Sequence, residues 1–462
     1  MGYRAFALKN LARHAPKYLP FADVASEEVP LSRLLRLSLF QITVGMTLTL
    51  LAGTLNRVMI VELAVPASLV SVMLAMPMLF APFRTLIGFK SDTHKSALGL
   101  RRAPWIWKGT IYQFGGFAIM PFALLVLSGF GESVDAPRWI GMSAAALAFL
   151  LVGAGVHIVQ TAGLALATDL VEEEDQPKVV GLMYVMLLFG MVVSALTYGA
   201  LLADYTPGRL IQVIQGTALM SVMLNMAAMW KQESISRERA RQMEQAEHPT
   251  FKEAMRLLLG RPGMLSLLTV IALGTFGFGM ADVLLEPYGG QALHLTVGET
   301  TKLTALFALG TLVGFGTASR VLGNGARPMP LAVLGALIGV PGFAAIILSS
   351  MISQGGIWLF LAGTFAIGLG IGLFGHATLT ATMRTAPADR IGLALGAWGA
   401  VQATAAGLGV ALAGVVRDGL VALPGAFGSG VAAPYNTVFA LEAVLLIVAI
   451  AFAAPLAWRG KR

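Results

Sequence analysis

Twelve long apolar stretches limit the folds open to this chain more than any other feature. A helix needs about 20 apolar residues to cross the hydrocarbon core of a bilayer. The stretches that meet this length are 34–61, 65–88, 104–129, 139–168, 179–203, 208–230, 263–286, 301–319, 329–350, 356–383, 390–416 and 436–458. Charged residues make up only 12% of the 462 residues, roughly half their share in a soluble domain. The sequence therefore predicts an all-α integral membrane protein with 12 transmembrane helices.

The distribution of Lys and Arg predicts the orientation in the membrane. Of the 32 Lys and Arg residues, 27 fall in the termini and loops of one side and five on the other. Basic residues favour the cytoplasmic side, and an even number of spans places both termini together, so we expect both termini to be cytoplasmic. The net charge of +8 then reflects topology and anionic lipid, and no nucleic-acid partner is expected.

The longest polar stretch divides the spans into two sets of six. We therefore expect a basic cytoplasmic segment at 1–33, a six-helix bundle at 34–230, a cytoplasmic linker at 231–262 and a second six-helix bundle at 263–462.

Short sequence matches relate the two halves. Ala167 and Thr168 at the end of the fourth span match Ala381 and Thr382 at the end of the tenth. Such weak similarity between two sets of six spans predicts two bundles related by an axis along the membrane normal.

Several classes of chemistry are excluded by composition and motif. The chain contains no Cys, so it forms no disulfide, zinc–thiolate site or cysteine nucleophile. It also lacks a Walker loop, a dinucleotide fingerprint, a metal-spaced histidine pair and a nucleophile elbow. We therefore do not expect an enzyme.

The loop after the second span resembles the signature loop of the major facilitator superfamily. It reads GFKSDTHKSALGLRR, in which Asp92 follows Gly88 by four residues and a basic cluster with Arg101 and Arg102 comes next. The resemblance implies that Gly88 permits close helix approach and that Asp92 latches the cytoplasmic face, forming a gating loop with the basic residues. The alternative is a basic loop with an incidental Asp.

Longer motifs resemble the bacteriochlorophyll-delivery family of that superfamily. They are KYLPFADVAS, LSLFQITVGMTLTLLAGTLNRVMIVEL, QTAGLALATDL and DVLLEPYGGQAL, and the likeness covers essentially the whole chain. The family includes PucC-like and LhaA-like antenna assembly factors of purple bacteria. The chain is most similar to the PucC-like factors of light-harvesting complex 2 (LH2), while the LhaA-like factors of the core antenna share most motifs.

The resemblance implies a function in pigment delivery. Members bind bacteriochlorophyll a and deliver it to newly inserted antenna alpha and beta polypeptides, with carotenoid or lipid as further candidate cargo. Bacteriochlorophyll synthase, the insertion machinery and membrane lipid are the other implied partners. The implied location is the bacterial cytoplasmic (inner) membrane and its intracytoplasmic photosynthetic extension.

Two histidines inside predicted spans are candidate ligands of the pigment magnesium, which accepts one axial donor. His376 follows the run GLGIGLFG, whose lack of bulk would let a flat ring approach the backbone. His157 lies in the fourth span with Gln160, a candidate donor to a ring carbonyl. The alternative is that His376 and Gln160 bond neighbouring helices and that the glycines are packing points.

Two carboxylates in the seventh span form the second part of the predicted pigment site. Asp282 and Glu286 are four residues apart and share one helix face. Glu286 is a candidate magnesium ligand because magnesium prefers oxygen donors, and the helix is predicted to break after it, at Pro287 and Tyr288. Tyr288 is included in the site. Proton coupling and an ion pair with Arg57 are the alternatives.

Polar residues in other spans complete the set. Asn56 and Arg57 are predicted to end the first span, where both are assigned to the pigment site and Arg57 is a candidate contact for a ring carbonyl or ester. The alternative is that Arg57 extends to the membrane interface. Gln41, Gln402 and Glu442 are predicted to form hydrogen bonds between helices.

Three functions are compatible with these residues. A pigment-binding assembly factor is favoured because the middles of several spans are almost entirely aliphatic, Gly or Met, which suits an apolar cargo taken from the bilayer. A proton-coupled transporter of a small amphiphile and an assembly chaperone that binds no pigment are the alternatives.

Overall fold

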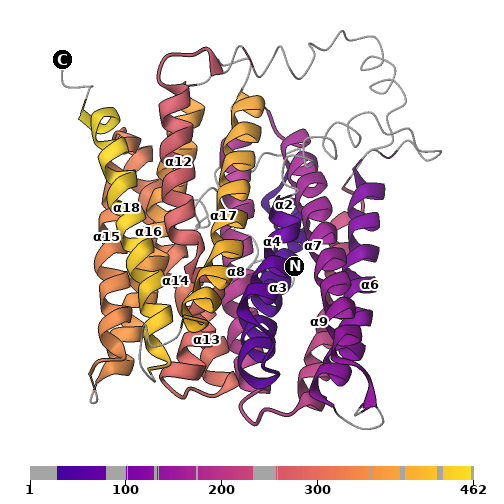
Figure 1. Ribbon diagram of the computed structural model, residues 1–462. Coiled ribbons are helices and arrows are strands. Elements are labelled where there is room, and N and C mark those ends of the chain that lie inside the picture. The colour runs from indigo at the N-terminus through magenta and orange to yellow at the C-terminus, as the bar shows by residue number, and fades with distance from the viewer. Residues whose placement is uncertain are drawn as a thin grey trace, which may run out of the picture.

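The computed structural model describes residues 29–79, 100, 102–129, 133, 135–172, 175–232, 256, 259–352, 355–385, 391–423 and 430–458. Every secondary-structure element within these ranges is a helix, and the helices run side by side in one bundle (Figure 1). Eleven helices of the described part are long and apolar enough to cross a membrane. The predicted all-α membrane fold is therefore confirmed.

The observed helices follow the apolar stretches, with π-helical turns (η) in the first span. The first half contains α2 (Leu31–Leu37), α3 (Leu39–Leu48), η2 (Thr49–Leu55), η3 (Val58–Glu62), α4 (Ala67–Leu79), α6 (Ala103–Ser128), α7 (Arg138–Asp169), α8 (Gln176–Leu201) and α9 (Pro207–Met229). The second half contains α12 (Met264–Gly279), α13 (Ala281–Ala292), α14 (Val297–Gly323), α15 (Pro328–Ser349), α16 (Gly356–Thr385), α17 (Ile391–Val421) and α18 (Ala432–Trp458). The predicted second span begins as α4, and its remaining residues lie outside the described part.

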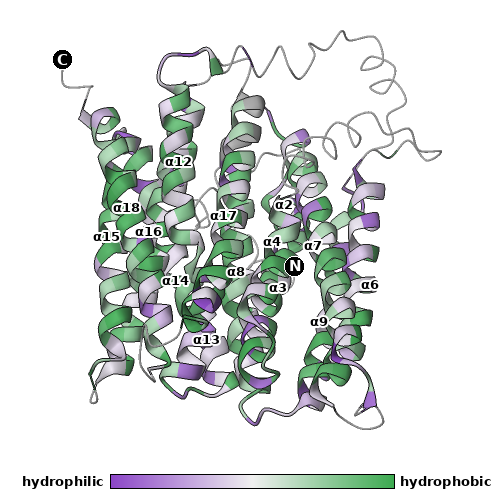
Figure 2. Cartoon of the chain, viewed as in Figure 1, coloured by the Kyte–Doolittle hydropathy of each residue, from purple (hydrophilic) through white to green (hydrophobic). Residues whose placement is uncertain are grey.

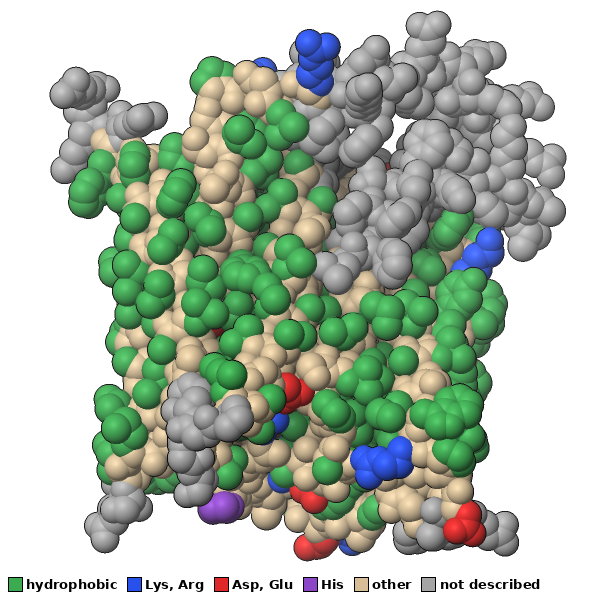
Figure 3. Space-filling view, in the orientation of Figure 1, with side chains coloured by type: hydrophobic (Ala, Val, Ile, Leu, Met, Phe, Trp, Pro, Cys, Tyr) green, Lys and Arg blue, Asp and Glu red, His purple; other side chains and the backbone are tan. Residues whose placement is uncertain are grey.

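The outer surface of the bundle matches a lipid environment. Hydrophobic residues run along the whole length of the helices (Figure 2). In the space-filling view hydrophobic side chains cover most of the face, and most of the charged side chains lie near its two ends (Figure 3). Apolar surface of this extent faces lipid at no cost, because lipid tails are as apolar as the side chains.

The interior divides into two hydrophobic clusters. One is built almost entirely from α2 to α9, and the other from α12 to α18. This division agrees with two six-helix bundles. The exact boundaries of the bundles and of the linker at 231–262 stay predictions, because most of the linker lies outside the described residues.

The two most extensive helix contacts across the halves are those of α4 with α17 and of α8 with α14. Gly414 of α17 lies against the backbone of Ala67 in α4, and Gly298 of α14 lies against Gly199 of α8. Glycine lets backbones approach closely, which is a common way for membrane helices to associate without a hydrophobic driving force. The two halves are therefore held together partly by close backbone packing.

We predict that Gly414→Ala lowers the thermal unfolding midpoint of the purified protein by a few degrees. An added Cβ would lie 2.7 Å from the carbonyl carbon of Ala67. Gly399→Ala is the matched control, because nothing lies within 4 Å of a Cβ at this position of the same helix. Both substitutions gain about 1 kcal/mol of helix propensity. The difference between their unfolding midpoints therefore measures the effect of the added Cβ on the contact with α4. Equal midpoints would contradict the packing described.

Candidate functional site

The candidate site lies at the end of the bundle that is predicted to face away from the cytoplasm, here called the far end. Its basic residues are Arg57, Arg138, Arg209, Lys302 and Arg417. The first span continues through η3 to Glu62, close to the end of the predicted stretch 34–61. Asn56 and Arg57 therefore lie inside the span and do not end it as predicted. Asn56 and Arg57 lie between two π-helical segments and are 0% and 3% exposed. Such π-helical turns frequently occur at functional sites.

Asn56 joins the first span to the seventh. Its Nδ2 donates to the carbonyl oxygen of Val283 at 2.7 Å. Val283 lies four residues before Pro287, which has no amide hydrogen to donate to that carbonyl. The predicted break after Glu286 is therefore wrong. The helix continues through Pro287 to Ala292 because a neighbouring helix supplies the missing donor, as membrane helices require.

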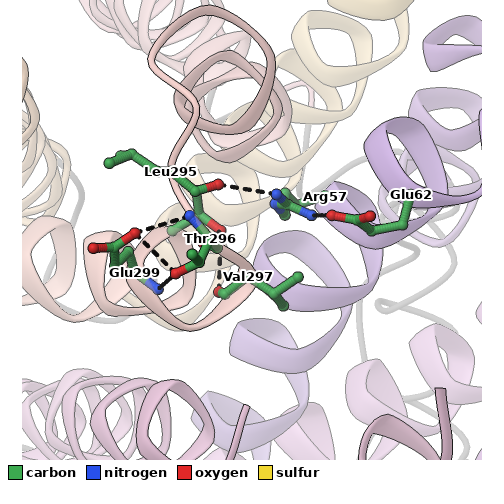
Figure 4. A network of polar contacts seen from close by, with 7 residues as sticks. Arg57, Glu62, Leu295, Thr296, Val297 and Glu299 are labelled. Carbon is green, nitrogen blue, oxygen red and sulfur yellow. Dashed lines mark hydrogen bonds and ion pairs between the residues drawn. The ribbon is translucent and has the colours of Figure 1, made fainter. Parts of the chain in front are cut away.

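Arg57 forms an ion pair with Glu62 and donates to the carbonyl oxygen of Leu295 at 3.0 Å (Figure 4). The expected alternative, an ion pair with Asp282 or Glu286, is not formed, because Glu62 lies on the next turn of the same span. Arg57 also does not extend to the interface. Burial, followed by the nearby Glu62 carboxylate, raises the pKa of Tyr205 in the loop before α9 to about 12.

Asp282 and Glu286 lie on the same short helix but in different surroundings. The Glu286 carboxylate is 4% exposed and accepts a hydrogen bond from Thr304 through Oε1. Its Oε2 has no hydrogen-bond partner. The Asp282 side chain is exposed, and no ion pair or hydrogen bond involves it among the described residues. Its helix α13 packs on α14, α17, α18 and the first span, so Asp282 lies on a helix at the contact between the halves.

Glu442 of α18 contacts the seventh span where α12 passes into α13. Its Oε1 accepts a hydrogen bond from the backbone amide of Ala281 at 2.6 Å. The side chain is fully buried, and the prediction that it bonds a neighbouring helix is confirmed.

Tyr288 is part of the core of the second half. Its hydroxyl donates to Ile346 O or exchanges a hydrogen bond with Ser349, both at 3.0 Å. Its ring packs against Phe360 and Phe439, and the side chain is fully buried. These contacts account for both the ring and the hydroxyl without a ligand.

His376 lies far from the carboxylates. It is 20 residues from the far end of α16, whereas Glu286 is six residues from the far end of α13. At 1.5 Å per residue these depths are about 30 Å and about 9 Å. His376 and Glu286 therefore cannot bind the same magnesium. The His376 side chain is partly exposed, and its ring lies 4.2 Å from that of Phe315.

The glycine run before His376 serves helix packing. A Cβ at Gly370 would lie 2.6 Å from the carbonyl oxygen of Gly335, and one at Gly372 would lie 2.7 Å from the amide nitrogen of Phe315. The expectation that a flat ring approaches the backbone here is therefore wrong for these two positions, which neighbouring helices already cover. Only Gly375 of this run has nothing within 4 Å.

The remaining predicted residues lie elsewhere. His157 is partly exposed and Gln160 is buried, both on α7 in the first half. Arg102 at the start of α6 is buried and donates to the Asp169 carboxylate at 3.1 Å. The other gating-loop residues, Gly88, Asp92 and Arg101, lie outside the described residues.

Sequence reasoning missed three polar partners. Thr304 binds Glu286, and Glu62 pairs with Arg57. Asp418 of α17 accepts a hydrogen bond from the backbone amide of Ser68 at 2.7 Å and so caps the start of α4 across the halves. A Thr residue in an apolar span is too common to predict a functional contact. Asp418, a charged residue beside Arg417 at the end of a span, could have been recognised from the sequence.

Solved structures with the same fold are transporters. A bacterial homologue of the iron transporter ferroportin in an inward-facing state has a TM-score of 0.65 at 16% identity, over 93% of this chain and 99% of its own. A bacterial homologue of the lysosomal transporter Spinster, inward-facing and occupied, has a TM-score of 0.64 at 16% identity, over 92% and 96%. At these identities the likeness establishes the major facilitator-type fold alone.

Sequence comparisons identify the family. A family model described as PUCC protein matches residues 54–461. Protein PucC of Rhodobacter capsulatus is 92% identical over 462 residues and 100% of both chains, and Protein PucC of Cereibacter sphaeroides is 58% identical over 97% of both. The bacteriochlorophyll synthase 44.5 kDa chain of Rhodobacter capsulatus is 29% identical over 90% of this chain and 93% of its own. The chain therefore belongs to the PucC family and is a multi-pass protein of a bacterial membrane.

Proposed function

We propose that the protein is an LH2 assembly factor that binds bacteriochlorophyll and delivers it to newly inserted antenna alpha and beta polypeptides. The observation that carries the proposal is the exposed Asp282 carboxylate, which has no hydrogen-bond or ion-pair partner among the described residues and lies on α13, where the two apolar bundles meet. Such a group is costly in a membrane protein and marks a ligand path. An apolar macrocycle with one magnesium and a long tail suits these surroundings.

The accessible donors are Asp282 and His376. Magnesium prefers oxygen ligands, and Asp282 supplies one without disturbing an existing contact. Glu286, the carboxylate predicted from the sequence, is enclosed between the first span and Thr304. His376 is partly exposed but lies about 15 Å nearer the cytoplasmic end than Asp282, so the two donors would serve two pigment positions, one at each depth.

Family membership supports a place in pigment metabolism. One relative is named as a bacteriochlorophyll synthase chain, and we propose bacteriochlorophyll synthase and the insertion machinery as partners. Proton-coupled transport of a small amphiphile remains the second candidate, since the fold is shared with transporters and carboxylates lie inside the bundle.

We predict that protein purified in mild detergent from pigment-replete membranes carries bacteriochlorophyll a. The measurement is long-wavelength absorbance that co-elutes with the protein in size-exclusion chromatography. An apolar pigment held between the bundles should remain bound when the surrounding lipid is replaced by detergent. Pigment-free protein would contradict the proposal and favour a chaperone that binds no pigment.

We predict that Asp282→Ala and His376→Ala each weaken the pigment affinity of one position about tenfold, which corresponds to about 1.4 kcal/mol of binding free energy. The measurement is the pigment-to-protein ratio of the purified protein, which should fall in each variant. Loss of an axial donor leaves the macrocycle held by apolar contacts alone. Asp204→Asn, on the exposed loop before α9, is the matched control and should retain pigment. Wild-type pigment content in both alanine variants would reject the two ligand assignments.

A further inference from the structure

Side-chain oxygens from three helices gather where the halves meet at the far end. The first span contributes Thr54 and Asn56, α13 contributes Glu286, and α14 contributes Thr301 and Thr304. The Thr54 and Thr301 hydroxyl oxygens lie 3.3 Å apart, and the Thr304 hydroxyl donates to Glu286. These five side chains are called the oxygen cluster.

The oxygen cluster is enclosed, and two of its acceptor oxygens receive no hydrogen bond. Thr54, Asn56 and Thr301 are fully buried, and Glu286 is 4% exposed. Neither Glu286 Oε2 nor Asn56 Oδ1 has a hydrogen-bond partner. A Cβ at Gly53 would lie 2.6 Å from Glu286 Oε1, so the carboxylate is held directly against the first span. Two buried acceptors of this kind require a donor or a cation.

Glu286 forms no ion pair with the nearby arginines. Arg57 is already paired with Glu62, and Arg417 is paired with Asp418. The other charged groups on α13 and the helices packed against it are the exposed Lys302, Glu299 at the start of α14, Arg320 near its cytoplasmic end, Asp282 and Glu442. An isolated carboxylate in a membrane interior is strongly disfavoured, so Glu286 must be neutralised by a bound cation or by a proton.

We propose that the oxygen cluster is a binding site for one monovalent metal cation. Hard cations take carboxylate, amide and hydroxyl oxygens as ligands, and the single charge of Glu286 matches a single positive charge. Divalent sites recruit further carboxylates, and no group of three or more His, Cys, Asp or Glu residues that could hold a metal ion is found among the described residues. A bound cation would tie the first span to α13 and α14 and so hold the far end closed. The proposal does not depend on pigment binding.

The test is thermal unfolding of the purified full-length protein in sodium chloride and in choline chloride at equal ionic strength and fixed pH. We expect sodium to raise the unfolding midpoint in a saturable way, because a ligand that binds only the folded state stabilises it. Glu286→Gln should abolish the rise. Thr54→Val, which removes one oxygen at nearly constant volume, should increase the half-saturating sodium concentration about tenfold. Glu172→Gln, an exposed carboxylate elsewhere on the chain, should behave as wild type.

Three results would overturn the proposal. The first is an equal unfolding midpoint in the two salts, and the second is an unchanged sodium effect in Glu286→Gln. The third is an unfolding midpoint that rises as the pH is lowered but does not respond to sodium, which would show that a proton neutralises Glu286. If Glu286→Gln does not fold, Thr54→Val carries the test, and an unchanged half-saturating concentration in this variant overturns the proposal. Pigment content, measured on the same samples, separates this site from the proposed function.

Discussion

Proline has no amide hydrogen, so Pro287 leaves the carbonyl oxygen of Val283 without its helical donor. The side chain of Asn56, from the other half of the molecule, supplies that donor at 2.7 Å. An unpaired backbone carbonyl is disfavoured inside a membrane protein, so the contact with the first span stabilises the continuation of the seventh span to Ala292. Helix continuity in one half therefore depends on contact with the other.

Further polar contacts join the two halves at the far end, next to the hydrogen bond of Asn56. Arg57, the residue after Asn56, reaches Glu62 on its own span and Leu295 on the other half. Asp418 caps α4 from the second half. Polar contacts thus supplement the glycine packing of α4 on α17 and of α8 on α14. The groups proposed to meet a ligand, Asp282 and the oxygen cluster, lie on or beside α13, the helix that this contact preserves.

The fold was largely predictable from the sequence, because the length and hydropathy of each span are properties of a single helix. The uneven distribution of Lys and Arg between the two sides likewise predicts the orientation in the membrane. The site was less predictable. The sequence placed Asp282, Glu286, Asn56 and Arg57 near one end, yet their partners depend on packing between helices. Tyr288 was misjudged because its neighbours Phe360 and Phe439 are distant in sequence. The expected break at Pro287 failed for the same reason, since its compensating donor lies 231 residues earlier.

A double-mutant cycle between Asn56 and Pro287 tests the central contact most directly. The free energy of unfolding is measured in sodium-free buffer for wild type, Asn56→Ala, Pro287→Ala and the double variant. Asn56→Ala alone should cost about 1 kcal/mol, because the Val283 carbonyl loses its donor. In the Pro287→Ala background it should cost much less, since the restored amide of residue 287 donates to that carbonyl. An equal cost of Asn56→Ala in both backgrounds would contradict the account.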